Sequence, residues 1–290
     1  MSTDAAPTPP ATARPSEPVV PRSLDLLFLV ARLAPYRLLG SPKGQHVFER
    51  NVLLWRNQWP ALLSGLFEPL LYLLVLGVGV GSLVDGTADL GGAAYGEFVA
   101  AGLLGAAAMN ATVYETYNVY FKLRHDGIYD AMGATPAAPR DIAAGEIVWA
   151  VSRVALYAVG FMVVAAALGV LASPLALLAI PVALLIGFTF AALTLWATTY
   201  MRSWNDFDLL QIAIVPLFLF SATFYPISVL PTWAQVITQI SPLYHGVAAL
   251  RQVMLGQVDV WIMAHLGVLV VLGLVGFRLG ARRFVVLLRT

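Results

Sequence analysis

The sequence lacks cysteine, is poor in charged residues and contains no phosphate-binding glycine loop. Without cysteine there are no disulfides and no thiolate metal sites. Charged residues make up 11% of the 290 residues and hydrophobic residues 59%, which is too apolar for a single soluble core. Since no G-x-x-x-x-G-K-[ST] motif occurs, the chain does not cradle ATP in that manner. A net charge of only +1 gives no basis for nucleic-acid binding.

Long uncharged runs dominate the second half of the chain, at residues 154–201, 209–250 and 260–277. A membrane-spanning helix needs about 20 apolar residues, so the first run is long enough for two spans. Pro174 breaks that run, because proline cannot continue one helix but suits the first turn of the next. The pattern predicts an all-α, polytopic membrane protein with six transmembrane helices. The predicted spans are residues 60–84, 93–118, 142–171, 174–200, 209–229 and 260–281.

The basic residues predict how this protein sits in its membrane. All but one of the 17 lysines and arginines fall on the same side of the six predicted spans. The exception is Arg251, which shares the other side with Asp85, Asp89 and Asp259. By the positive-inside rule, both termini are predicted to be cytoplasmic.

The run 209–250 is long enough for two spans, but a seventh crossing would place the arginine-rich C-terminus outside. We therefore expect one span, followed by a non-crossing helical hairpin at the outer face. Apolar residues recur with helical spacing from Trp233 to Ile240, which predicts a short amphipathic helix. Pro242 is predicted to open a second short helix, residues 243–255, which carries Arg251.

The segment before the first span divides into two parts. The first 22 residues contain six prolines and few large apolar side chains, which predicts a disordered tail. Residues 23–59 are predicted to form cytoplasmic interfacial helices, and residues 60–285 the six-span domain. One of these helices would carry an apolar stripe lying in the interface plane. The stripe consists of Phe48, Val52, Trp55 and Trp59.

Three strings resemble one family of membrane proteins. They are FEPLLYLLVLGVGVG at 67–81, ATPAAPRDIAAGEIVW at 134–149 and FYPISVLPTWAQVITQISPLYHGVAALRQVMLG at 224–256. Together they resemble the permease subunits of type-2 ABC (ABC-2) exporters, nearest the nodulation-factor and daunorubicin-type drug exporters. The resemblance covers about residues 45–285.

The resemblance implies a bacterial inner-membrane exporter of an amphipathic substrate: a lipid, a lipid-linked glycan or a hydrophobic drug. It implies a homodimer, or a pair with a similar permease, and two cytoplasmic ATPase subunits that bind ATP and Mg. This chain would itself hold no cofactor, and its other partners would be membrane lipids. The resemblance also implies that the loop between spans 2 and 3 docks on the ATPase.

Within that loop, small apolar side chains are rimmed by charge, as in a protein docking patch; the alternative is a solvated loop. The predicted docking residues are Asp126, Gly127, Ile128, Tyr129, Asp130 and Met132.

Charged and aromatic residues within the spans suggest further sites. Glu68 and Arg153 lie at similar predicted depths, so they are predicted to form an ion pair; the alternative is that each reaches water independently. Tyr114, Tyr117 and Phe121 share one stripe, which fits either a substrate path or an interfacial aromatic belt.

In the outer hairpin, we single out Trp233, Pro242 and Arg251. The Arg251 guanidinium would either fix the hairpin or meet an anionic lipid headgroup.

Two other functions compete with ATP-driven export. An ion-coupled secondary transporter would be expected to show inverted repeats and broken helices near the midplane, and no repeat is evident. An intramembrane enzyme would need a nucleophile with a base, or paired carboxylates, at one depth. The four histidines fall on different predicted elements without metal-ligand spacing, so we expect solitary packing roles and no catalysis.

Overall fold

The computed structural model describes residues 43–55, 59–84 and 90–288, and each regular element in these ranges is a helix. Five of the helical segments are long and apolar enough to cross a membrane. The chain is therefore an all-helical integral membrane protein. The predicted tail, residues 1–22, and most of the first interfacial segment lie outside the described residues.

The first candidate span is continuous but changes its helical geometry. It consists of α3 (Trp59–Tyr72), the π-helix η2 (Leu73–Val80) and α4 (Gly81–Val84). Pro69 lies inside α3 and has no N–H to donate to the preceding turn. The wider π turns begin four residues later, which fits the association of π segments with irregular hydrogen bonding in helices. The predicted boundaries of this span agree with the structure.

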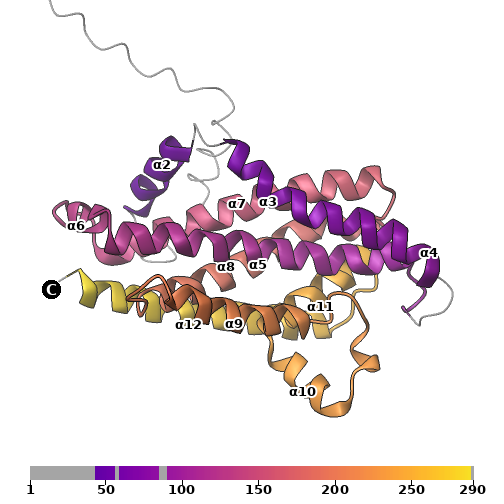
Figure 1. Ribbon diagram of the computed structural model, residues 1–290. Coiled ribbons are helices and arrows are strands. Elements are labelled where there is room, and N and C mark those ends of the chain that lie inside the picture. The colour runs from indigo at the N-terminus through magenta and orange to yellow at the C-terminus, as the bar shows by residue number, and fades with distance from the viewer. Residues whose placement is uncertain (1–42, 56–58, 85–89, 289–290) are drawn as a thin grey trace, which may run out of the picture.

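Four further long segments form the bundle shown in Figure 1. They are α5 (Tyr95–Arg124), α7 (Pro139–Ala167), the 3-10 turn η3 (Pro174–Leu178) with α8 (Ala179–Thr198), and α12 (Trp261–Leu287). Nearly the whole apolar window of α5 is buried, so this helix lies at the centre. Helix α5 also extends beyond its predicted end at residue 118, because Lys122 finds buried partners there.

The predicted fifth span is only partly helical. Helix α9 (Asp206–Leu219) has 14 residues, which gives a length of about 21 Å. A typical hydrocarbon core is about 30 Å thick, so α9 is not one of the five candidates. The predicted continuation to residue 229 is wrong, because the chain leaves the helix at Phe220. Ala222 then takes a left-handed backbone conformation, with φ of 56°.

Two short helices follow, as the sequence predicts. After the 3-10 turn η4 (Ile227–Val229), α10 (Thr232–Ile240) and α11 (Pro242–Leu255) form what we call the hairpin segment, residues 232–255. At the junction of the two helices, the Ser241 hydroxyl donates to the Leu217 carbonyl of α9 at 3.5 Å. Helix α11 ends at Leu255, and the following Gly256 lies next to Ser173 in the turn before η3. The hairpin segment thus returns the chain to that end of the bundle.

The two ends of the bundle are distinct (Figure 1). Helix α2 (Gly44–Trp55), helix α6 (Ile128–Gly133) and the C-terminus gather at one end, which we call the α6 end. Helix α4 lies at the opposite end, which we call the hairpin end because η4 and the end of α11 lie there.

Small residues allow the helices to approach closely, as is typical when lipid surrounds a bundle. A Cβ atom on Gly102 of α5 would lie 2.6 Å from the Thr223 carbonyl oxygen, so only glycine fits where the chain passes from α9 to the hairpin segment. Gly276 and Gly280 of α12 face the backbone of α8 in the same way. This small-residue pair therefore packs within one protomer.

Candidate functional site

Helix α6 presents an acidic surface at the α6 end. Gly127 has a φ of +59°, a left-handed conformation that glycine adopts without strain, and the helix begins after it at Ile128. Asp126 and Asp130 are exposed, whereas Tyr129 is buried against Phe284, with ring centroids 5.5 Å apart. The predicted docking residues thus divide into an exposed acidic rim and a buried anchor.

Burial raises the pKa of Tyr129 well above its usual value, and the nearby Glu146 carboxylate adds to this shift. The phenol is therefore neutral at physiological pH. Its ring holds α6 against the end of α12, so α6 is fixed to the bundle by packing rather than by charge.

Helix α2 packs on α7 with the apolar stripe that the sequence predicts. Phe48 and Val52 are fully buried, and the Phe48 ring lies 5.9 Å from Trp149. A Cβ on Gly145 of α7 would come within 2.5 Å of the Val47 Cβ, so glycine permits this approach. The stripe therefore faces protein, not a free membrane interface, and the fourth predicted residue, Trp59, belongs to α3 instead.

A groove of about 430 Å³ opens between the start of α2 and the loop after α6. The Lys43 ammonium closes one side by donating to the Pro136 carbonyl at 2.7 Å. The remaining lining residues are His46, Val47, Met132, Thr135 and Ala137. We call α6 together with this groove the α6 surface.

Beneath the α6 surface, a buried ion pair connects three helices. The Lys122 ammonium of α5 lies 2.9 Å from the Glu146 carboxylate of α7. Asn51 of α2 donates to the same carboxylate at 2.8 Å and accepts from Lys122 at 3.1 Å. Because each charged group has partners, the usual cost of burying it is offset. The network fastens α2 to both α5 and α7.

A second buried ion pair joins α5 to α7 at greater depth. Arg153 pairs with Glu115, and it also donates to the Tyr157 hydroxyl at 3.2 Å. Glu115 accepts further from the Trp149 indole N–H and from the Asn118 amide, both at 3.1 Å. All of these residues lie on α5 and α7.

The predicted Glu68–Arg153 pair is wrong. Glu68 is exposed on α3 and takes part in none of the ion pairs of the described residues. The carboxylate that meets Arg153 is that of Glu115, on the face of α5 that meets α7, whereas the Glu68 side chain is exposed. Glu115 was missed as the partner of Arg153, because its position in the sequence does not reveal which face of α5 meets α7.

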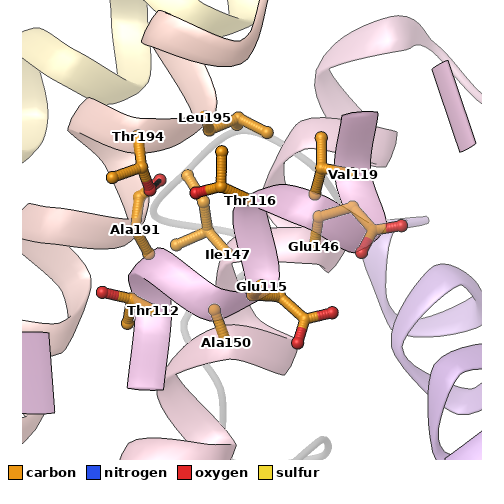
Figure 2. Close-up of a pocket in the computed structure, with 10 residues that line it drawn as sticks. All are labelled: Thr112, Glu115, Thr116, Val119, Glu146, Ile147, Ala150, Ala191, Thr194 and Leu195. Carbon is orange, nitrogen blue, oxygen red and sulfur yellow. Dashed lines mark hydrogen bonds between the residues drawn. The ribbon is translucent and has the colours of Figure 1, made fainter. Parts of the chain in front are cut away.

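Between the two ion pairs lies a small cavity (Figure 2). Glu115 and Glu146 border it, together with three threonines, Thr112, Thr116 and Thr194. Its volume is about 10 Å³, close to the minimum that a single water molecule needs. This cavity cannot admit a substrate.

The three aromatic residues predicted for a substrate path have different surroundings. Tyr117 stacks on Phe207 of α9, with ring centroids 4.2 Å apart. Phe121 is partly exposed and lies 5.6 Å from Trp204, while Tyr114 is exposed. Tyr117 therefore joins α5 to α9. Trp204 and Phe207 were missed as partners because they come from a distant link in the sequence.

The structure of the hairpin segment agrees in part with the sequence prediction. Trp233, Ile237 and Ile240 are exposed, whereas the small residues Ala234 and Thr238 face the protein. Pro242 is the first residue of α11, as predicted. Arg251 donates from Nη2 to the Ala222 carbonyl at 2.7 Å, which fixes α11 to the segment after α9.

Two histidines that were expected to be solitary are adjacent. The Nδ1 atoms of His245 and His265 lie 2.8 Å apart, and His245 Nε2 lies 2.9 Å from the Gln239 carbonyl oxygen. The hairpin segment brings them together, although they belong to different helices. In the described part of the chain, no cluster of three potential ligands for a metal ion occurs.

Comparison with known proteins identifies the family. Residues 44–255 match the family model of the ABC-2 type transporter. This chain belongs to the ABC-2 type transporter family. It is 35% identical to Nodulation protein J of Rhizobium leguminosarum bv. trifolii over 79% of this chain and 88% of that protein. It is also 35% identical to Nodulation protein J of Rhizobium meliloti, over 80% of this chain and 88% of that protein. Its identity to Nodulation protein J of Neorhizobium galegae is 31%, over 77% of this chain and 85% of that protein.

The matched range gives the family assignment a structural meaning. It begins at the first residue of α2 and ends at the last residue of α11. The α6 surface, both buried ion pairs and the hairpin segment are therefore parts of the ABC-2 transporter region. The chain is accordingly a membrane subunit of a transporter.

Proposed function

We propose that this ABC-2 transporter is the permease subunit of an ATP-driven exporter, and that a separate ATPase docks on the α6 surface. The observation that carries the proposal is the Lys122–Glu146–Asn51 network directly beneath that surface. Through it, a force applied at α2 reaches α5 and α7 together. The exposed carboxylates Asp126 and Asp130 offer charge for docking, and the groove offers apolar contact.

In this proposal, the partner ATPase is present in two copies and carries the ATP and Mg. The permease pairs with a second copy of itself or with a similar permease. ATP-driven closure of the ATPases displaces the α6 surface, and a path between the two permeases opens to the opposite side. The cargo is amphipathic: a lipid, a lipid-linked glycan or a hydrophobic drug. The exposed aromatic rings of Tyr114 and Phe121 would contact such a molecule.

The proposed topology has six spans in a bacterial inner membrane, with α9 as a short fifth span. Both termini and α6 face the cytoplasm, and the hairpin segment does not cross. The positive-inside rule supports this arrangement. So does the position of Gly256 beside Ser173, because it puts the end of the hairpin segment next to the turn between spans 3 and 4.

The geometry gives less support to an ion-coupled transporter. Such a protein needs a carboxylate or histidine that can exchange protons or ions along its path. Glu115 and Glu146 are instead held by Arg153 and Lys122.

The test is docking of an ABC ATPase encoded beside the permease gene. Co-purification and ATP hydrolysis are measured for the unchanged permease and for the double variant Asp126→Arg, Asp130→Arg. Because both side chains are exposed, the variant should fold normally but lose ATPase binding at least tenfold. Asp259→Arg reverses a single exposed charge at the hairpin end and serves as the control, with Asp126→Arg alone as the matched single docking variant.

Equal binding by the docking variant and the control would remove the α6 surface from the proposal. Reconstituted vesicles then test the energy source. Substrate movement that follows a proton gradient and ignores ATP would refute ATP-driven export.

A further inference from the structure

A cavity of about 290 Å³ lies at the hairpin end, between α11, the segment after α9 and the first turns of α12. It has room for several water molecules or one small anionic group. Hydrogen-bonding side chains line much of it: Tyr244, Arg251, Gln252, Gln257 and His265. Among the described residues, no aspartate or glutamate lines this cavity.

Arg251 is the cation of this cavity, and its hydrogen-bonding capacity is mostly unused. A guanidinium has five N–H donors, and Nη2 of Arg251 uses one of them on the Ala222 carbonyl. Its Nε is buried without a hydrogen-bond partner among the described residues. The Phe98 ring covers one face of the guanidinium at 3.6 Å. Among the ion pairs of the described residues, none involves Arg251, although Asp259 and Glu97 lie at the same end.

Burial lowers the pKa of Arg251 to about 10, so the group is still charged at neutral pH. A charge in this setting is poorly compensated unless a counter-charge approaches it. The aromatic face supplies part of that compensation, and one carbonyl supplies another part. The Nε atom is itself buried, so an anion in the cavity would meet the terminal edge of the guanidinium, whose two Nη groups can bind two oxygens of one anion.

The neighbouring residues add neutral donors to this cation. The Gln252 side-chain oxygen accepts the Asp259 backbone N–H at 3.1 Å, which leaves its amide N–H groups for another partner. The Tyr244 hydroxyl also lines the cavity. Ala222, which receives Nη2 of Arg251, has a left-handed backbone that is unusual for a residue other than glycine. Such strained residues cluster at binding sites.

We propose that this cavity binds an oxyanion, a phosphate, sulfate or carboxylate group, on Arg251 with help from Tyr244 and Gln252. The anion is either the headgroup of a membrane lipid or an anionic group on a soluble or transported molecule. The site is independent of the docking of an ATPase. It would stand even if the energy source proposed above were wrong.

The binding test uses the full-length permease in nanodiscs of phosphatidylcholine, which has no net charge. Sodium phosphate and sodium sulfate are titrated at constant ionic strength, and the rise in unfolding temperature is measured. We expect a saturable rise that Arg251→Gln reduces at least tenfold in apparent affinity. Arg283→Gln is the matched control, because Arg283 also has a buried, unpartnered Nε and an aromatic neighbour, Tyr200, but does not line this cavity.

A second arm identifies a lipid source. Nanodiscs containing phosphatidylglycerol are prepared, and lipid that remains bound is counted by native mass spectrometry. Retention that depends on Arg251, without an effect of free phosphate or sulfate, assigns the site to a lipid headgroup. Binding of free anions assigns it to a soluble or substrate-borne group. If neither arm responds to Arg251→Gln, the proposal is wrong.

Two further variants keep the test decisive if Arg251→Gln fails to fold. Tyr244→Phe and Gln252→Leu keep the cation and should each weaken binding about twofold to tenfold, as expected for one neutral hydrogen bond. Asp85→Asn with Asp89→Asn removes the two carboxylates in the link between the first two predicted spans, at positions outside the described residues. If anion binding appears only in that double variant, Arg251 is already neutralised by the chain itself and the proposal is overturned.

Discussion

The ion pair between Glu115 and Arg153 makes the sharpest prediction about the bundle. The Glu115 and Arg153 side chains are only 3% and 7% exposed, so removal of one charge leaves the other buried without its partner. Such a loss typically costs about 3–5 kcal/mol of folding free energy. We expect the cost of Glu115→Gln to lie near the lower limit of this range, because glutamine keeps a hydrogen-bond acceptor for the Trp149 indole N–H. Arg153→Met should lie nearer the upper limit.

The double variant Glu115→Gln, Arg153→Met should be milder than the sum of the single changes. Neither charge is then buried alone, and a coupling of about 1–3 kcal/mol is expected for residues in one network. The control is Glu68→Gln on α3, an exposed side chain whose replacement should cost less than about 0.5 kcal/mol. It should also be additive with Arg153→Met.

Unfolding of the purified permease in mild detergent by added dodecyl sulfate provides the measurement. Tryptophan fluorescence reports on the surroundings of this ion pair. The Trp55 ring centroid lies 4.8 Å from the Arg153 guanidinium carbon, and the Trp149 indole is hydrogen-bonded to Glu115. Strict additivity of the Glu115 and Arg153 changes would refute the pair. Coupling between Glu68 and Arg153 instead would restore the pairing expected from depth alone.

Three further experiments test other parts of the structure. Gly145→Val should destabilise the fold by about 1–3 kcal/mol, because α2 must move away from α7 to make room for the side chain. Limited proteolysis within α2 should then be faster, and an unchanged cleavage rate would contradict the packing of α2 on α7. Lys122→Met should cost about 3–5 kcal/mol in the same unfolding assay, and Lys122→Met with Glu146→Leu should recover part of that loss. Since the chain has no cysteine, single cysteines at Ser228 and Gln257 can be labelled cleanly. An impermeant maleimide should reach both from outside intact cells, and reaction of only one would show that the hairpin segment crosses the membrane.

The elements that the sequence predicts well are those with strong local signals. Pro242 marks the start of α11 to the residue, and helical spacing from Trp233 locates α10. The fifth span was overextended because an apolar run does not distinguish a helix from a buried irregular segment. The first three residues after Phe220 are buried, but their polar groups bond to each other, as in the 2.6 Å contact between the Ser221 and Thr223 hydroxyls.

The partners of buried charged groups were harder to predict, because a contact depends on the rotation of each helix about its axis as well as on depth in the membrane. Counting residues along a helix gives the depth of Arg153, but the rotation of α3 and α5 about their axes decides which carboxylate it meets. Glu115 points toward α7 and Glu68 does not. The pairing of His245 with His265 needs the return path of the hairpin segment, which no local pattern contains.

The two ion pairs between α5 and α7 also fix how these antiparallel helices align. On α5 the acid Glu115 precedes the base Lys122 by about two turns, and on α7 the acid Glu146 precedes the base Arg153 by the same interval. Sliding one helix by two turns would bring Glu115 opposite Glu146, or Lys122 opposite Arg153. Like charges at low dielectric make either arrangement costly, so one register is selected. We therefore expect α5 and α7 to move as one body, and conformational change in this transporter to come from the less tightly packed helices α3, α9 and α10.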